Sequence, residues 1–112
     1  PDVINAVALL ETEFAPETVL ARLHAIEAEF GRSREVRWGN RTLDLDLLMY
    51  GFETIDGPRL TVPHYGMAER AFVLLPLQEI APQDFEIPAL GLLDELVARL
   101  PSPSGCERLA TA

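Results

Sequence analysis

The order of its elements predicts an α+β layer fold for this chain of 112 residues. Three observations support that class: helical spacing of apolar residues after position 16, strand-like alternation over residues 42–50, and apolar helical segments at residues 71–80 and 90–100. The length allows one domain with a single modest core. Hydrophobic residues make up 48% of the chain and charged residues 24%, as in ordinary globular proteins.

The first half of the chain predicts a strand followed by a helix. Residues 3–10, VINAVALL, form an apolar run rich in β-branched residues that we interpret as a buried strand. Pro16 suits the first helical position, and Glu17 suits the positive first turn. The predicted helix has one apolar face and a glycine cap at Gly31. That face consists of Val19, Leu23, Ile26 and Phe30.

A second strand with two acidic residues is predicted after a polar loop at residues 32–40. Residues 42–50 alternate, so that Leu43, Leu45 and Leu47 face one way and Asp44 and Asp46 the other. The Asp-Gly-Pro sequence at residues 56–58 predicts a turn, and residues 59–62 predict a short returning strand that Pro63 ends.

The last third predicts two helices and a tail. Residues 71–80 are predicted to be helical, with Pro76 breaking or kinking the helix. Residues 90–100 predict an amphipathic helix, and residues 101–112 a loose tail. So few strands would leave a sheet edge unpaired, and the chain begins with Pro1 rather than methionine, so we expect a missing upstream segment.

The composition narrows the class of ligand. A net charge of −9 argues against nucleic acid and anionic membranes as partners. No apolar run is long enough for a membrane span, and the single cysteine, Cys106, favours a reducing, cytoplasmic location. All nine basic residues are arginines, and four of them lie within residues 32–41 with one acid, Glu35. This local cluster predicts a small polyanionic ligand.

Asp44 and Asp46 predict a magnesium site. Side chains two apart on a strand share a face, with Cα atoms about 6.5–7 Å apart. A few hard oxygen ligands suit Mg²⁺, which keeps waters and completes its coordination with substrate phosphates. The acidic pair and the arginines would therefore converge on one ligand, most simply a nucleoside triphosphate.

Each of these signals also has a structural interpretation. The acidic pair and Arg41 could form a surface ion network, and the arginine run could be a solvated loop. Trp38 could be a core aromatic residue, and His24 and His64 could be structural. The clustering of metal ligands, anion binders and aromatic residues in two short segments favours the functional interpretation.

Two long motifs resemble one family. RWGNRTLDLDLLMYG (residues 37–51) and RLTVPHYGMAERAFVLLPLQEIAP (residues 59–82), with PDVINAV and EAEFGRSR, are similar to 6-hydroxymethyl-7,8-dihydropterin pyrophosphokinases. The resemblance covers residues 1–100 and implies a ferredoxin-like sandwich, an antiparallel sheet covered by helices. The family carries about fifty residues before PDVIN that complete these layers, so its first strand-helix-strand is expected to be missing here.

The resemblance implies a function in folate biosynthesis. The family is a kinase-type transferase that moves diphosphate from ATP to the hydroxymethyl group of the pterin and releases AMP. Catalytic positions matched here are Arg32, Arg34, Asp44 and Asp46, of which the two acids hold two Mg²⁺ ions. Positions matched to ATP binding are Glu27, Trp38, Arg41, Arg59, Thr61, His64, Tyr65 and Arg70. Positions matched to pterin binding are Asn5, Trp38 and Phe72.

Three positions depart from the family pattern. Val3 replaces an aromatic residue beside the pterin, His24 a glutamine on the adenine side, and Asn40 a proline in the loop. Two other functions stay open at this point. The chain could be a nucleotide-binding fragment that needs its missing N-terminal part or a fused folate enzyme as a partner. It could also be another Asp-x-Asp enzyme, such as a nucleotide-sugar transferase.

Overall fold

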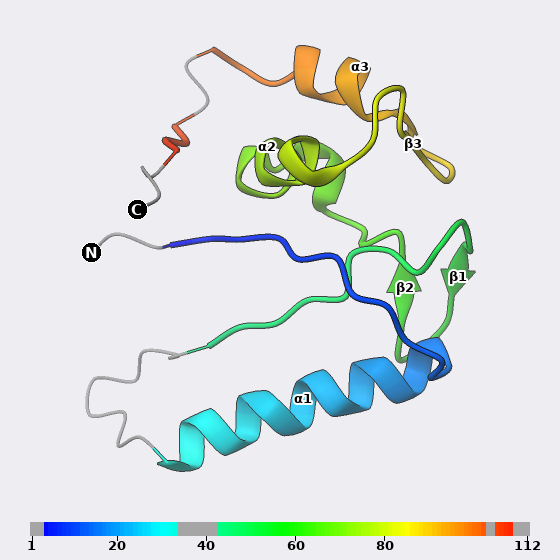
Figure 1. Cartoon of the computed structure of the whole chain (residues 1–112), viewed down its shortest axis with the longest axis vertical. Coiled ribbons are helices and arrows are strands. Elements are labelled where there is room, and N and C mark those ends of the chain that lie inside the picture. Colours follow the sequence, from blue (N-terminus) through cyan, green and yellow to red (C-terminus); the bar gives the residue numbers. More distant parts are fainter. Residues whose placement is uncertain (1–3, 34–42, 103–104, 109–112) are drawn as a thin grey trace. The chain divides into compact units, whose positions relative to one another are not determined.

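The computed structural model describes residues 4–33, 43–102 and 105–108 (Figure 1). Helices and short antiparallel strands make up the described part, which confirms the predicted α+β class. The chain divides into two units. One unit is Thr12–His64, and the other combines Pro1–Glu11 with Tyr65–Ala112.

Helix α1 spans Pro16–Ser33. The Val19 amide donates to the Ala15 carbonyl at 3.0 Å, which makes Ala15 the N-cap residue that precedes the helix. Pro16 and Glu17 occupy the first turn as predicted, since proline loses no hydrogen bond there. The predicted end at Gly31 is wrong, because Gly31 lies outside the left-handed region and the helix continues to Ser33.

The inward face of α1 differs from the predicted one. Val19 and Leu23 are half-buried as expected, but Ile26 and Phe30 are exposed. Glu27 is half-buried instead, one residue around the helix from Ile26. The half-buried face of α1 therefore includes Glu27. The Glu27 carboxylate accepts a hydrogen bond from the Leu45 amide, and this bond keeps the side chain half-buried.

Strands β1 and β2 form a two-residue antiparallel ladder. Strand β1 spans Ile55–Asp56 and β2 spans Thr61–Val62, with Ile55 opposite Val62. The predicted turn between them is confirmed, and the Gly57 amide closes it by donating to the Leu60 carbonyl at 3.0 Å. The Val62–Pro63 peptide bond is cis.

Two predicted strands are absent from the described part of the chain. Residues 4–10 and residues 43–50 carry no strand ladder there. A strand needs a partner for its amides and carbonyls, and no described segment pairs with either one. Residues 43–50 bond singly to other groups instead, and Ile4, Leu9 and Leu10 are exposed.

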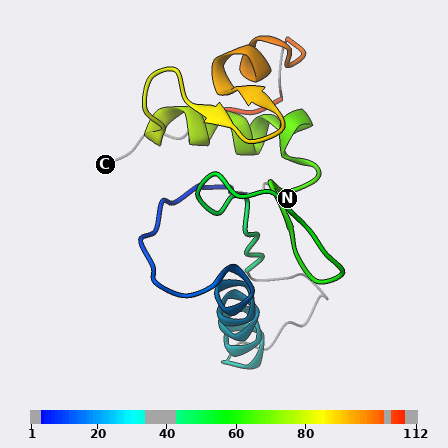
Figure 2. The same ribbon diagram turned by 90° about the vertical axis from the view of Figure 1, so that its right-hand side faces the viewer.

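The described part of the second unit holds two helices and a hairpin. Helix α2 spans Ala71–Ile80 and α3 spans Leu93–Ala98, while β3 (Glu86–Ile87) pairs antiparallel with β4 (Gly91–Leu92). Helices α2 and α3 pack together (Figure 2), with the Gln78 side-chain amide donating to Asp94 at 2.9 Å. Buried residues of the two helices, of strand β3 and of the 3₁₀ helix Met67–Glu69 form the core of this unit. They are Met67, Val73, Leu74, Leu77, Ile87, Leu93 and Leu96.

The limits of α2 are those predicted, but Pro76 does not end the helix. The Ala81 amide still donates to the Leu77 carbonyl at 2.9 Å, so hydrogen bonding continues beyond the proline. The predicted start of the last helix at residue 90 is wrong. Gly91 has φ +107° and pairs in β4, so α3 begins only at Leu93.

Beyond the helices, Arg108 forms a 3.3 Å ion pair with Glu79 of α2. Both side chains are well exposed, so this pair contributes little to stability. In the described ranges no helix combines the length and the apolar character needed to cross a bilayer.

We expect Leu74→Ala to lower the free energy of unfolding by about 2–5 kcal/mol, because Leu74 is fully buried and its removal leaves a cavity. Ile80→Ala is the matched control, on the same helix but 43% exposed, and should cost less than about 1 kcal/mol. Urea unfolding followed by circular dichroism measures both. Equal losses would contradict the assigned core.

Candidate functional site

Residues 43–50, here named the carboxylate segment, contain two exposed acids. Leu43, Leu45 and Leu47 are half-buried, whereas Asp44 and Asp46 are exposed. The predicted alternation is therefore observed over these five positions, although no ladder among the described residues enforces it. In an extended strand, side chains at positions i and i+2 lie on the same side. Here the burial pattern shows that both carboxylates are accessible to solvent.

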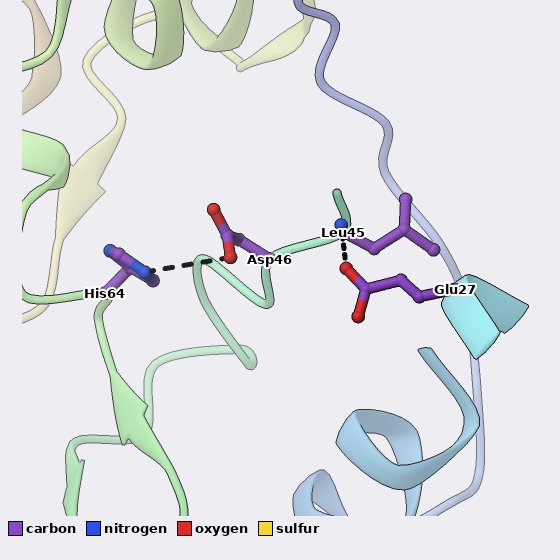
Figure 3. A network of polar contacts seen from close by, with 4 residues as sticks. All are labelled: Glu27, Leu45, Asp46 and His64. Carbon is purple, nitrogen blue, oxygen red and sulfur yellow. Dashed lines mark hydrogen bonds and ion pairs between the residues drawn. The ribbon is translucent and has the colours of Figure 1, made fainter. Parts of the chain in front are cut away.

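Helix α1 holds the segment through Glu27. The Leu45 amide donates to the Glu27 carboxylate at 2.5 Å (Figure 3). Leu45 lies between the two aspartates, so this bond fixes the backbone at the middle of the acidic pair. Figure 3 shows the Asp46 carboxylate turned toward His64 and away from Glu27.

His64 holds the segment from its other side. Its backbone amide donates to the Leu48 carbonyl at 2.8 Å, and its Nε2 lies 4.0 Å from the Asp46 Oδ1. The imidazole is 17% exposed and the carboxylate 47%, so Asp46 stays accessible to a ligand beside a shielded histidine. Val62, only 2% exposed, fixes the end of strand β2, two residues before His64.

A third set of contacts fixes the end of the segment. The Tyr50 hydroxyl donates to the Phe14 carbonyl at 2.5 Å. The Arg22 guanidinium of α1 lies 4.3 Å from the centre of the Phe14 ring, within range of a cation–π contact. Phe14 precedes α1, so Tyr50 ties the segment to the start of the helix.

The acidic pair is chemically suited to a magnesium ion, which takes few protein ligands. In the part of the chain that the structure describes, no three His, Cys, Asp or Glu side chains gather closely enough to hold a metal. Mg²⁺ is usually held by one or two carboxylates, with waters and substrate phosphates supplying the rest. Two exposed carboxylates on a fixed backbone match that requirement.

Three further predicted site residues come together in the unit that contains Tyr65. The Arg70 guanidinium lies 5.9 Å from the centre of the Tyr65 ring and 5.8 Å from that of Phe72. Tyr65 is 80% exposed and Phe72 41% exposed, so the cluster borders solvent. Arg70 also occupies the N-cap of α2, where the helix dipole is positive. Both features attract an anion.

The other predicted residues lie elsewhere in the described ranges or outside them. Asn5 is exposed in the irregular segment of residues 4–10. Arg59 is exposed in the turn before β2, and Thr61 lies in β2 opposite Asp56. The backbone of Arg32 belongs to α1. Arg34, Trp38 and Arg41 lie outside the described residues.

Some of the groups that hold the site carry little or no sequence signal. The Leu45 amide and the Leu48 carbonyl are backbone groups, which every residue has. Tyr50 could have been noticed, because a tyrosine at the end of an apolar run usually needs a partner for its hydroxyl. Its partner is again a backbone carbonyl, which no motif reveals.

Comparison with known proteins identifies a matching family. The sequence model of the family described as 7,8-dihydro-6-hydroxymethylpterin-pyrophosphokinase matches residues 1–82. The matched range contains the carboxylate segment, His64 and the Tyr65–Arg70–Phe72 cluster.

Three curated relatives, each named 2-amino-4-hydroxy-6-hydroxymethyldihydropteridine pyrophosphokinase, are similar to the chain. The one from Pseudomonas aeruginosa is 52% identical over 112 residues, which are 100% of this chain and 68% of the relative. The relative from Haemophilus influenzae is 54% identical over 97 residues, which are 87% of this chain and 60% of the relative. The relative from Synechocystis is 51% identical over 82 residues, which are 73% of this chain and 42% of the relative. The chain thus spans between two fifths and about two thirds of these relatives.

We expect Glu27→Ala to speed hydrogen exchange at the Leu45 amide and to lower stability by about 1–3 kcal/mol, because a part-buried donor loses its charged acceptor. Glu27→Gln retains an acceptor oxygen and should lose less. His24→Ala, exposed on the same helix, is the control and should leave exchange at Leu45 unchanged. Exchange followed by NMR tests this order, and an unaffected Leu45 amide in Glu27→Ala would contradict it.

Proposed function

Because the chain belongs to the 7,8-dihydro-6-hydroxymethylpterin-pyrophosphokinase family, we propose that it carries the reaction centre of a Mg²⁺-dependent diphosphate transfer. The reaction moves diphosphate from ATP to the hydroxymethyl group of 6-hydroxymethyl-7,8-dihydropterin and releases AMP, in the cytoplasm and in folate biosynthesis. The observation that carries this proposal is the exposed Asp44 and Asp46 pair on a backbone held by Glu27 and His64.

In this proposal Asp44 and Asp46 hold two magnesium ions. Bound there, Mg²⁺ would neutralise phosphate charge and help to orient the triphosphate. The protein's contribution is to hold both carboxylates exposed on a fixed segment. His64 lies beside Asp46 in this arrangement, with its Nε2 4.0 Å from the carboxylate.

The arginines supply the remaining positive charge. Transfer requires the hydroxymethyl oxygen to attack the β-phosphorus in line, as the bond from that phosphorus to the oxygen of AMP breaks. Guanidinium groups stabilise the charge that develops on the phosphate oxygens. We assign this role to Arg32, Arg34 and Arg41, with Arg59 and Arg70 also meeting ATP. Glu27, Trp38, Thr61, His64 and Tyr65 complete the proposed ATP set.

Pterin binding is assigned to Asn5, Trp38 and Phe72. A flat polar heterocycle is well held by aromatic faces together with an amide that both donates and accepts hydrogen bonds. Asn5 and Phe72 are both exposed, which leaves them accessible to such a ligand. We further propose a ferredoxin-like sandwich for the fold in which these residues act.

A second candidate function is nucleotide binding without transfer. It is considered beside transfer because the chain aligns with 68%, 60% and 42% of the lengths of the three relatives. Calorimetry of the chain with Mg²⁺ and a non-hydrolysable ATP analogue, with and without the pterin, separates the two. If the affinity for the nucleotide is the same with and without the pterin, this candidate is supported. Ordered binding of the nucleotide and the pterin supports transfer.

We expect Asp46→Asn to reduce AMP formation by about 10²–10³-fold or more, the usual effect of removing one electrostatic stabiliser of a transition state. The substitution keeps the side-chain shape, so the unfolding midpoint should change little. Asp56→Asn is the matched control, since Asp56 is also exposed in the same unit but lies in β1. Chromatography of AMP formed from ATP and the pterin measures the effect, and unchanged turnover in Asp46→Asn would remove this residue from the proposed mechanism.

A further inference from the structure

Gly66 leaves a space that the Arg70 side chain fills. A Cβ built on Gly66 would lie 2.9 Å from each of three Arg70 atoms, Cζ, Nε and Nη2. These distances are shorter than real Cβ contacts, so the guanidinium packs directly over the Gly66 backbone. Gly66 has φ −101° and ψ 1°, which other residues also adopt. The glycine therefore matters for the room that it leaves to the guanidinium and not for its backbone conformation.

The backbone of Arg70 is firmly held, so its side chain starts from a fixed point. The Arg70 amide donates to the Met67 carbonyl at 3.3 Å, and its carbonyl accepts from the Val73 and Leu74 amides at 3.0 Å each. Met67 and Leu74 are fully buried. The place of the guanidinium is then decided by its rotamer and by the space beside it.

Two aromatic rings further limit the positions that the Arg70 guanidinium can take. The guanidinium lies within 6 Å of the centres of the Tyr65 and Phe72 rings, and Gly66 provides the surface beneath it. A planar guanidinium confined in this way loses less conformational entropy when it binds a phosphate than a free one does.

We propose that Gly66 is a positioning residue that sets the place of the Arg70 guanidinium and thereby its contact with the ATP phosphates. The contact with ATP rests on the proposed function, whereas the placement of Arg70 does not. An alanine at position 66 would push the guanidinium away, because the contacted atoms are the far end of a flexible side chain. The fold itself would be preserved for the same reason.

The placement is tested in the free chain by the NMR signal of the Arg70 Nε–H group, assigned by its loss in Arg70→Lys. We expect this signal to shift in Gly66→Ala, because the guanidinium moves relative to the two rings. Gly57→Ala is the matched control, since a Cβ there meets only the Leu60 carbonyl at an ordinary 3.5 Å. Circular dichroism should show the same unfolding midpoint for Gly66→Ala and the unchanged chain.

The functional part is tested by calorimetry with Mg²⁺ and a non-hydrolysable ATP analogue. Gly66→Ala should weaken binding about tenfold, the size of losing one charge-assisted hydrogen bond. In the Arg70→Ala background the same substitution should have no further effect, because Gly66 acts through Arg70.

The outcomes separate the two proposals. An unshifted Nε–H signal in Gly66→Ala, or a tenfold loss that persists without Arg70, overturns the role of Gly66. A chain that binds no nucleotide at all overturns the proposed function, and the Nε–H signal alone then decides whether Gly66 places Arg70.

Discussion

The candidate site depends on one hydrogen bond, from the Leu45 amide to the Glu27 carboxylate. In the described ranges the carboxylate segment has no strand partner, so the regular ladder that usually fixes a strand is replaced by single bonds. The bond from His64 to the Leu48 carbonyl acts three residues further along. Together they hold the backbone on both sides of Asp46, and this keeps the two acids exposed while the leucines turn inward.

Local electrostatics explain how a chain with a net negative charge can bind a polyanionic ligand. The net charge of −9 repels anions at long range, but salt screens such repulsion beyond about 8–10 Å. Binding is then decided by charges in contact with the ligand, and every basic residue here is an arginine. Arg70 shows the benefit of that choice, because its planar group can pack on Gly66 beside two rings and still offer donors.

The sequence predicted the elements that local rules determine. Pro16 and Glu17 mark the start of α1, the limits of α2 are as predicted, and the glycine-proline turn lies between β1 and β2. Elements that depend on distant partners were predicted poorly. Residues 43–50 alternate as a strand does, but alternation cannot supply a partner strand. Similarly, Ile26 was assigned inward by its spacing, whereas Glu27 turns inward because an amide from another segment bonds to it.

The small number of metal ligands has a consequence for the proposed reaction. Two exposed carboxylates alone give Mg²⁺ a weak site, since the ion gives up its waters reluctantly. Phosphate oxygens of the bound nucleotide would supply the missing ligands, so the ion and the nucleotide would bind more tightly together than apart, by a reciprocal coupling. A third fixed carboxylate would strengthen metal binding without the nucleotide and so weaken that coupling. In the proposed site, the substrate would itself complete the coordination of the metal.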